Sequence, residues 1–171
     1  MPDYPKIPVA MDMSYEGEAQ GSAFMMGDVE VRDACCVVFG GTFRWQGEVY
    51  CVRIQGQKEN PADKCWCNDQ PARNGDSVFL KGWPLLPVKP AIFHLIVERV
   101  LHGLSKIAID PVLYAMGEYV SACNKLQLYA KKLSVAADAL AEARHQHQQQ
   151  EDIVAQLKQK LDAAEAQSPC R

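Results

Sequence analysis

The sequence predicts an α+β protein with a small antiparallel β-sheet head covered by one helix, followed by a long C-terminal helix of the coiled-coil type. Three patterns lead to this prediction: apolar alternation between residues 34 and 56, an amphipathic segment after a proline-rich connector, and a heptad repeat beyond residue 110. They divide the 171 residues into an acidic arm at 1–27, a head domain at 28–104 and a helical stalk at 110–166.

The arm contains three prolines and three glycines, and no helical or strand period lasts more than a few residues. This composition predicts an extended or partly disordered segment. The alternation of Ile7, Val9, Met11 and Met13 favours a short edge strand within it.

The clearest β signal is a hairpin over residues 42–54. Gln46-Gly47 fits a two-residue turn, because glycine supplies the positive φ that such a turn requires. Pairing around this turn sets Phe43 opposite Tyr50 and Trp45 opposite Glu48. One face then collects Phe43, Trp45, Tyr50, Val52 and Ile54, and the other carries Thr42, Arg44, Val49, Cys51 and Arg53.

The segments around this hairpin complete the predicted head. The apolar run 34–39 suits a central strand, and Gly40-Gly41 marks a bend or bulge after it. A polar loop at 56–76 is followed by a short strand at 78–80 and an extended connector at 83–90. A helix at 91–104 then presents an apolar stripe made of Phe93, Ile96, Val97, Val100, Leu101 and Leu104.

The strongest pattern begins after Asp110-Pro111, which fits an N-cap followed by proline at the first helical position. In the heptad notation a to g, the a positions recur at sevens, and the predicted oligomerisation residues are Tyr119, Leu126, Leu133, Leu140, His147, Val154 and Leu161. The d positions are mostly alanine. A helix of this length, roughly 80 Å at about 1.5 Å per residue, needs another helix along part of its stripe. Pairing orientation, a reversal near 145–150, and packing within the chain all remain open.

Charge excludes some partners. The formal net charge is −3, the acidic excess lies in the first 27 residues, and the remaining regions are each neutral. Nucleic-acid binding needs a concentrated positive face, so we expect no nucleic-acid partner. No apolar run is long enough to span a bilayer and the N-terminal residues lack a signal-peptide pattern. We therefore expect a cytoplasmic protein with no membrane association.

Seven cysteines raise two chemical alternatives. Cys36, Cys51, Cys65 and Cys67 are candidate zinc ligands, because four soft ligands within about thirty residues can hold zinc. Their spacing argues against this, since one pair of cysteines, 35 and 36, is adjacent and the other has one residue between. Cys51 shares a predicted face with Arg44 and Arg53, and two cations can lower a thiol pKa. Small apolar core residues are the simpler interpretation of the cysteines, and we expect no cofactor.

The loop at 57–76 and the connector after it offer a candidate surface for a protein partner. Its residues are Trp66, Arg73 and Trp83, because a tryptophan in a loop either fills the core or meets a partner. Phosphate-binding loops and hydrolase signatures are absent from the sequence.

These observations favour a non-enzymatic protein-binding or assembly module that oligomerises through its C-terminal helix. Accessory or inhibitor proteins of phages and mobile elements have a comparable build, which is an analogy of architecture alone. The alternatives are a zinc-stabilised regulatory module and a thiol-dependent enzyme using Cys51.

Overall fold

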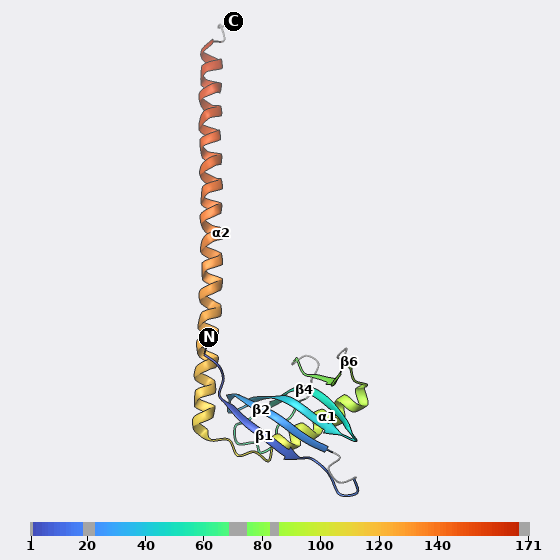
Figure 1. Cartoon of the computed structure of the whole chain (residues 1–171). Helices are drawn as coiled ribbons and strands as arrows, with labels where there is room; N and C mark the ends of the chain where they lie inside the picture. Colours follow the sequence, from blue (N-terminus) through green and yellow to red (C-terminus); the bar gives the residue numbers. More distant parts are fainter. Residues whose placement is uncertain (1, 19–22, 69–74, 83–85, 168–171) are drawn as a thin grey trace. The chain divides into compact units, whose positions relative to one another are not determined.

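The computed structural model describes residues 2–18, 23–68, 75–82 and 86–167. Six strands precede two helices along the chain (Figure 1): β1 Lys6–Asp12, β2 Ala23–Asp33, β3 Cys36–Trp45, β4 Glu48–Gln57, β5 Ser77–Leu80, β6 Leu86–Pro87, α1 Pro90–Leu104 and α2 Pro111–Gln167. The chain forms two compact units, residues 1–124 and residues 125–171, and α2 contributes to both. The α+β class is confirmed.

The strands form one antiparallel sheet in the order β1-β2-β3-β4-β5-β6, so each strand pairs with its neighbour in sequence. The predicted hairpin is confirmed: Phe43 pairs with Tyr50, and Trp45 pairs with Glu48. Gln46 and Gly47 have φ angles of 50° and 83°, which are the left-handed values of a two-residue hairpin turn. This turn fixes the register of β3 against β4.

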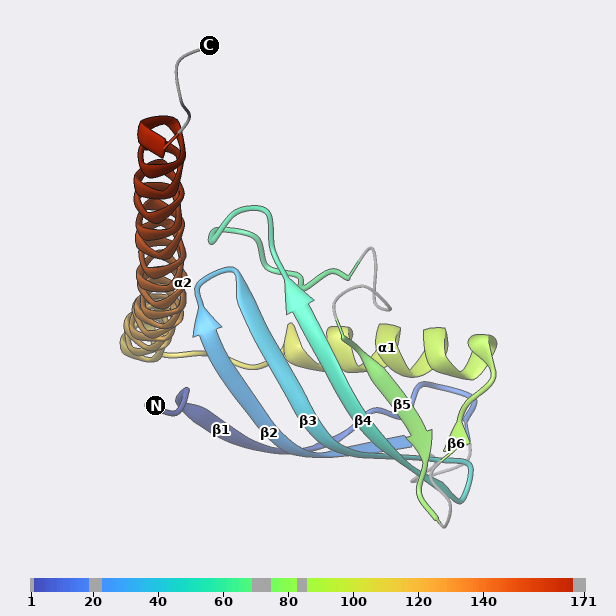
Figure 2. The same ribbon diagram turned by 90° about the horizontal axis from the view of Figure 1, so that it is seen from above.

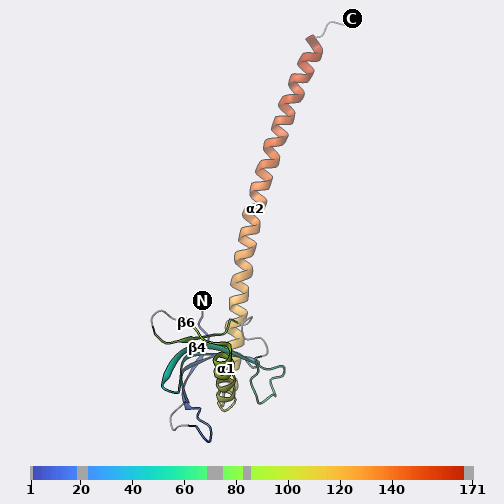
Figure 3. The same cartoon turned by 90° about the vertical axis from the view of Figure 1, so that its right-hand side faces the viewer.

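One face of the sheet holds the core and the other is open. Figures 2 and 3 show the strands arching over α1, which crosses the covered face. The largest fully buried side chains come from both layers: Phe39, Phe43, Met25, Ile54, Ile96, Leu104, Val29, Val31, Val37 and Val100. On the opposite side of α1, His94, Glu98 and His102 are exposed. The single covering helix expected from the sequence is therefore present.

A pair of glycines lies in the middle of the covered face, where β2 and β3 approach closely. Gly27 pairs with Gly41, and a Cβ atom on Gly41 would lie 2.2 Å from the Met26 carbonyl oxygen and 2.7 Å from the Gly27 Cα. The predicted bulge at Gly40-Gly41 is wrong, because both residues keep their register with β4. The irregularity between β2 and β3 lies instead between Val31 and Asp33.

The segment predicted as an arm contributes β1 and the start of β2, so residues 6–12 pair along their length with β2. The turn region between them contacts α1. Glu18 accepts two hydrogen bonds from Arg99, one of them at 2.9 Å, and the Arg99 guanidinium lies 4.6 Å from the centre of the Tyr15 ring. These contacts attach the β1–β2 connection to the covering helix.

Both edges of the sheet contain proline. β1 is one edge and includes Pro8; β6 is the other, has two residues and ends at Pro87. Proline has no backbone N–H to donate, so it is tolerated at an edge and weakens further pairing there.

Helix α2 begins as the sequence predicts. The Val112 amide donates a hydrogen bond to Asp110 Oδ1 at 2.8 Å, which makes Asp110 the N-cap, and Pro111 is the first helical residue. The helix continues through residues 145–150, which the sequence left open as a reversal. Among the described residues, no helix is both long and apolar enough to cross a lipid bilayer.

Candidate functional site

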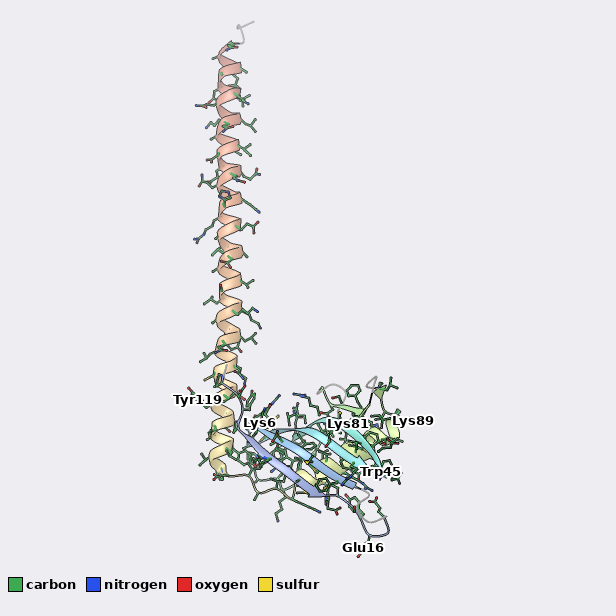
Figure 4. All side chains as sticks on the ribbon, viewed as in Figure 1. Lys6, Glu16, Trp45, Lys81, Lys89 and Tyr119 are labelled. Carbon is green, nitrogen blue, oxygen red and sulfur yellow. The ribbon has the colours of Figure 1, made fainter. Side chains whose placement is uncertain are left out.

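The most extensive candidate site is the apolar stripe of α2, defined here as the a and d positions of its heptads. The predicted apolar a residues Tyr119, Leu126, Leu133, Leu140, Val154 and Leu161 are between 53% and 73% exposed. Figure 4 shows side chains standing out along the helix, with Tyr119 on the side of α2 away from the sheet. Regularly spaced large apolar side chains at this exposure are typical of a surface that binds another protein.

Within the first compact unit, α2 uses a different face to pack against the head. Val120 is buried, and a Cβ atom on Gly117 would lie 2.5 Å from the Val31 carbonyl oxygen. The Ser121 hydroxyl lies 3.2 Å from the Tyr4 hydroxyl. Gly117 and Tyr119 are two residues apart, which is about 200° around a helix. The head therefore packs on one face of residues 111–124 and leaves the stripe uncovered on the other.

The stripe is interrupted by one polar layer. His147 and Gln150 occupy a and d positions, and both are exposed. His147 Nδ1 lies 3.7 Å from Glu151 Oε1, one turn further along. Near the N-terminal end of the stripe, a hydrogen bond with Cys123 raises the pKa of the Tyr119 phenol. A polar layer such as that of His147 and Gln150 weakens the contact between two paired helices and favours one register of their pairing.

The heptad pattern does not predict a second, smaller apolar patch on α2. Leu128 and Val135 lie at c positions, away from the stripe, and they border a hollow together with Lys131 and Lys132. Their spacing of seven residues repeats only once, so the sequence signal is weak compared with the stripe.

The predicted partner surface in the loop is not supported at Trp66. This side chain is 5% exposed and belongs to the core cluster, and Lys58 Nζ lies 4.3 Å from the centre of its ring. The backbone amide of Trp66 donates a hydrogen bond to Ser105 Oγ at 3.1 Å. The tryptophan therefore fills the core, and its ring is not available to a partner. Arg73 and Trp83 lie outside the described residues.

The four candidate zinc ligands do not converge. Cys36 pairs with Gln57, which pairs on its other side with Cys67, so one strand separates the two cysteines by about 10 Å. Cys51 lies six residues before Gln57 on β4, about 20 Å along the strand. Zinc ligands must all lie within about 2.3 Å of the ion. No group of three or more Cys, His, Asp or Glu side chains in the described ranges is placed to hold a metal.

Cys36 is a protonated thiol at neutral pH. Its burial, followed by the negative charge of Asp33, raises the pKa of Cys36 to about 11. Only the thiolate reacts quickly with alkylating agents. We expect Cys36 to react with iodoacetamide far more slowly than exposed Cys65 and Cys67 at pH 8, and to accelerate about tenfold per pH unit toward pH 10. Peptide mapping after timed alkylation measures this order, and equal rates for the three cysteines would contradict it.

Cys51 lies on the open face of the sheet with Thr42 and Phe79 as its cross-strand neighbours. Arg44, which the sequence placed beside it, has its guanidinium 5.6 Å from the centre of the Phe24 ring. The head's two histidines, at 94 and 102, belong to α1 and so lie across the sheet from this cysteine. A thiol nucleophile needs a base within hydrogen-bond reach, and these neighbours do not provide one.

The open face also has a hollow of about 310 Å³ that the sequence did not indicate. Lys6, Asp28, Glu30 and Arg53 contribute two positive and two negative groups to its lining. The charges compensate, so the hollow does not select an ion of either sign.

A half-buried polar cluster joins β4 to the segment just before β5. Asp76 Oδ1 accepts a hydrogen bond from the Gln55 amide at 2.7 Å, and Asn68 Nδ2 donates to the Gln55 carbonyl at 2.9 Å and to Asp76. Burial raises the pKa of Asp76. The hydrogen bonds to backbone and amide groups give the Asp76 carboxylate a structural role, whereas Asn68 Oδ1 is buried with no hydrogen-bond partner among the described residues.

Comparison with protein-family models, with curated proteins and with solved structures finds no significant match to this chain. The geometry described above is therefore the basis for assigning a function.

Proposed function

We propose that this protein is a non-enzymatic assembly module, whose α+β head is held in an oligomer by the apolar stripe of α2. The observation that carries the proposal is the exposed series of a-position side chains, which begins at residues 112–119 on the face of α2 opposite to Gly117 and recurs every seven residues along the helix. Burying such a series against a second helix removes apolar surface from water at about 25 cal/mol per Å².

The proposal includes a cytoplasmic location. All six cysteines in the described part of the chain are free thiols. Reduced cysteines persist in compartments that keep glutathione and thioredoxin reduced. Thiol counting on protein isolated with a rapid alkylating quench tests this point, and fewer than six free thiols would argue for an oxidising compartment.

The assembly is tested by absolute mass from light scattering behind size exclusion, over a range of concentrations. Leu133→Asp places an unpaired charge in the stripe, so we expect it to raise the dissociation constant by at least about 100-fold. Val135→Asp is the matched control, because Val135 is also apolar and 62% exposed on the same helix but lies off the stripe.

A clean monomer for the unmodified chain at all concentrations would overturn the proposal. If Val135→Asp dissociates the assembly and Leu133→Asp does not, the interface lies on the smaller patch of Leu128 and Val135 instead of the stripe.

A further inference from the structure

The residues of the stripe differ systematically in size between its two positions. Large side chains occupy the a positions, whereas five of the eight d positions are alanine: Ala115, Ala122, Ala136, Ala143 and Ala164. A parallel pair of identical helices would stack a on a and d on d. That arrangement alternates crowded leucine layers with empty alanine layers, and places His147 against His147 of the second copy.

Reversing one helix sets every a position opposite a d position. In the register proposed below, five of the eight a residues then meet an alanine, which fills these layers more evenly than the parallel pair does, whereas Tyr119 meets Leu157. We propose that the occupant of the stripe is a second copy of this chain in antiparallel orientation, in the register that places Leu133 opposite Ala143 and Leu140 opposite Ala136. This inference rests on the proposed function and specifies its partner and geometry.

Charge at the flanking positions selects this register. In an antiparallel pair the g positions of the two helices face each other, and in the proposed register Glu118 faces Lys160 of the other copy at both ends. The same register places Lys125 opposite Ile153 and Lys132 opposite Gln146, so no like charges meet at these positions.

Shifting one helix by seven residues in either direction removes the pairing of Glu118 with Lys160. Sliding the second helix so that Leu140 faces Ala143 would set Lys125 against Lys160, which is repulsive. Sliding it the other way, so that Leu133 faces Ala136, would set Glu118 against Ile153 and leave no opposite-charge pair at the g positions. The proposed register also aligns the whole repeat, because Val112 then faces Ala164.

The polar layer is accommodated by the same arrangement. His147 meets Tyr129 and Gln150 meets Leu126, so neither polar side chain is stacked on its own counterpart. Tyr129 offers a hydroxyl that can pair with the imidazole of His147. The two polar residues therefore meet different neighbours, which also distinguishes this register from the parallel alternative.

Zero-length carbodiimide crosslinking of mixed ¹⁴N and ¹⁵N full-length chains tests the geometry, with light scattering on the same sample. We expect a mixed-isotope crosslink between Glu118 and Lys160, since only an intermolecular link combines the two isotopes. A parallel pair would bring Lys160 next to Glu165 of the second copy instead. A dimer that gives the mixed Lys160–Glu165 link, or lacks the Glu118–Lys160 link, overturns the antiparallel register and leaves the assembly module intact; a monomer overturns both.

A charge exchange provides an independent measurement. Lys160→Glu should raise the dissociation constant about two- to tenfold, and adding Glu118→Lys in the same chain should restore it. Lys158→Glu is the control, because it changes the net charge equally while Lys158 faces Met116 in the proposed register. Failure of the double variant to recover the affinity of the unmodified chain would exclude the Glu118–Lys160 contact.

Discussion

Gly41→Ala should destabilise the head by about 3 kcal/mol, because the added methyl group has no space between β2 and β3. A Cβ atom there would lie 2.2 Å from the Met26 carbonyl oxygen and 2.7 Å from the Gly27 Cα. Both contacts are with backbone, which a side-chain rotation cannot relieve. The two strands would have to separate at the middle of the core face, so hydrogen bonds and packing would be lost together.

The neighbouring glycine provides the control. Nothing lies within 4 Å of a Cβ atom built on Gly40, so Gly40→Ala should leave stability unchanged or raise it by up to about 1 kcal/mol. Urea unfolding followed by tryptophan fluorescence reports on the head through Trp45 and Trp66. Equal unfolding midpoints for the two alanine variants would show that the close approach of Gly27 and Gly41 does not constrain the sheet.

Gly117→Ala should destabilise the packing of α2 on the head by about 2 kcal/mol, although the same change in an isolated helix stabilises it by about 1 kcal/mol. The sign reverses because the new Cβ atom would lie 2.5 Å from the Val31 carbonyl oxygen and 2.6 Å from that of Arg32. We expect faster hydrogen exchange at residues 111–124 and a lower melting temperature.

Gly103→Ala on α1 is the comparison variant. Its Cβ atom would meet the sulfur atoms of Met25 and Met13, which belong to flexible side chains that can move. This substitution should therefore cost much less than Gly117→Ala. If both variants raise the melting temperature, α2 does not depend on a close backbone contact at Gly117.

The parts of the fold that follow from neighbouring residues were predictable. The Gln46-Gly47 turn and the alternation on either side of it fixed a register that the structure reproduces. The start of α2 was predictable for the same reason, because Asp110 and Pro111 both act within one helical turn. The stripe of α2 depends only on spacing along a helix, so its residues were also accessible from the sequence.

Strand β2 was not predicted, because residues 23–27 were assigned to the arm and residues 28–33 were given no secondary structure. Val29 and Val31 alternate with Asp28, Glu30 and Arg32, which is a strand signal, but the glycines and prolines before residue 28 suggested an arm. The prolines of this segment are accommodated because β1 is an edge strand.

Contacts between residues that are far apart in the chain could not be predicted from sequence patterns. The burial of Trp66 depends on Ser105, 39 positions away in the chain, and on space left by Gly56 on β4. The role of Gly41 depends on Gly27 across the sheet, and no single-strand pattern identifies that pairing. The partner proposed for the stripe involves a second molecule, which a pattern along one chain does not identify.

The prolines on the two outermost strands have a consequence for the size of any complex. An antiparallel sheet with free edges can pair with the edge strands of further molecules and grow into a fibre. Here β1 contains Pro8, and β6 consists of Leu86 and Pro87 alone. Growth by adding strands is therefore disfavoured at both ends of the sheet. Association through the stripe, as proposed here, closes once each stripe is covered, so we expect complexes of fixed stoichiometry instead of open polymers.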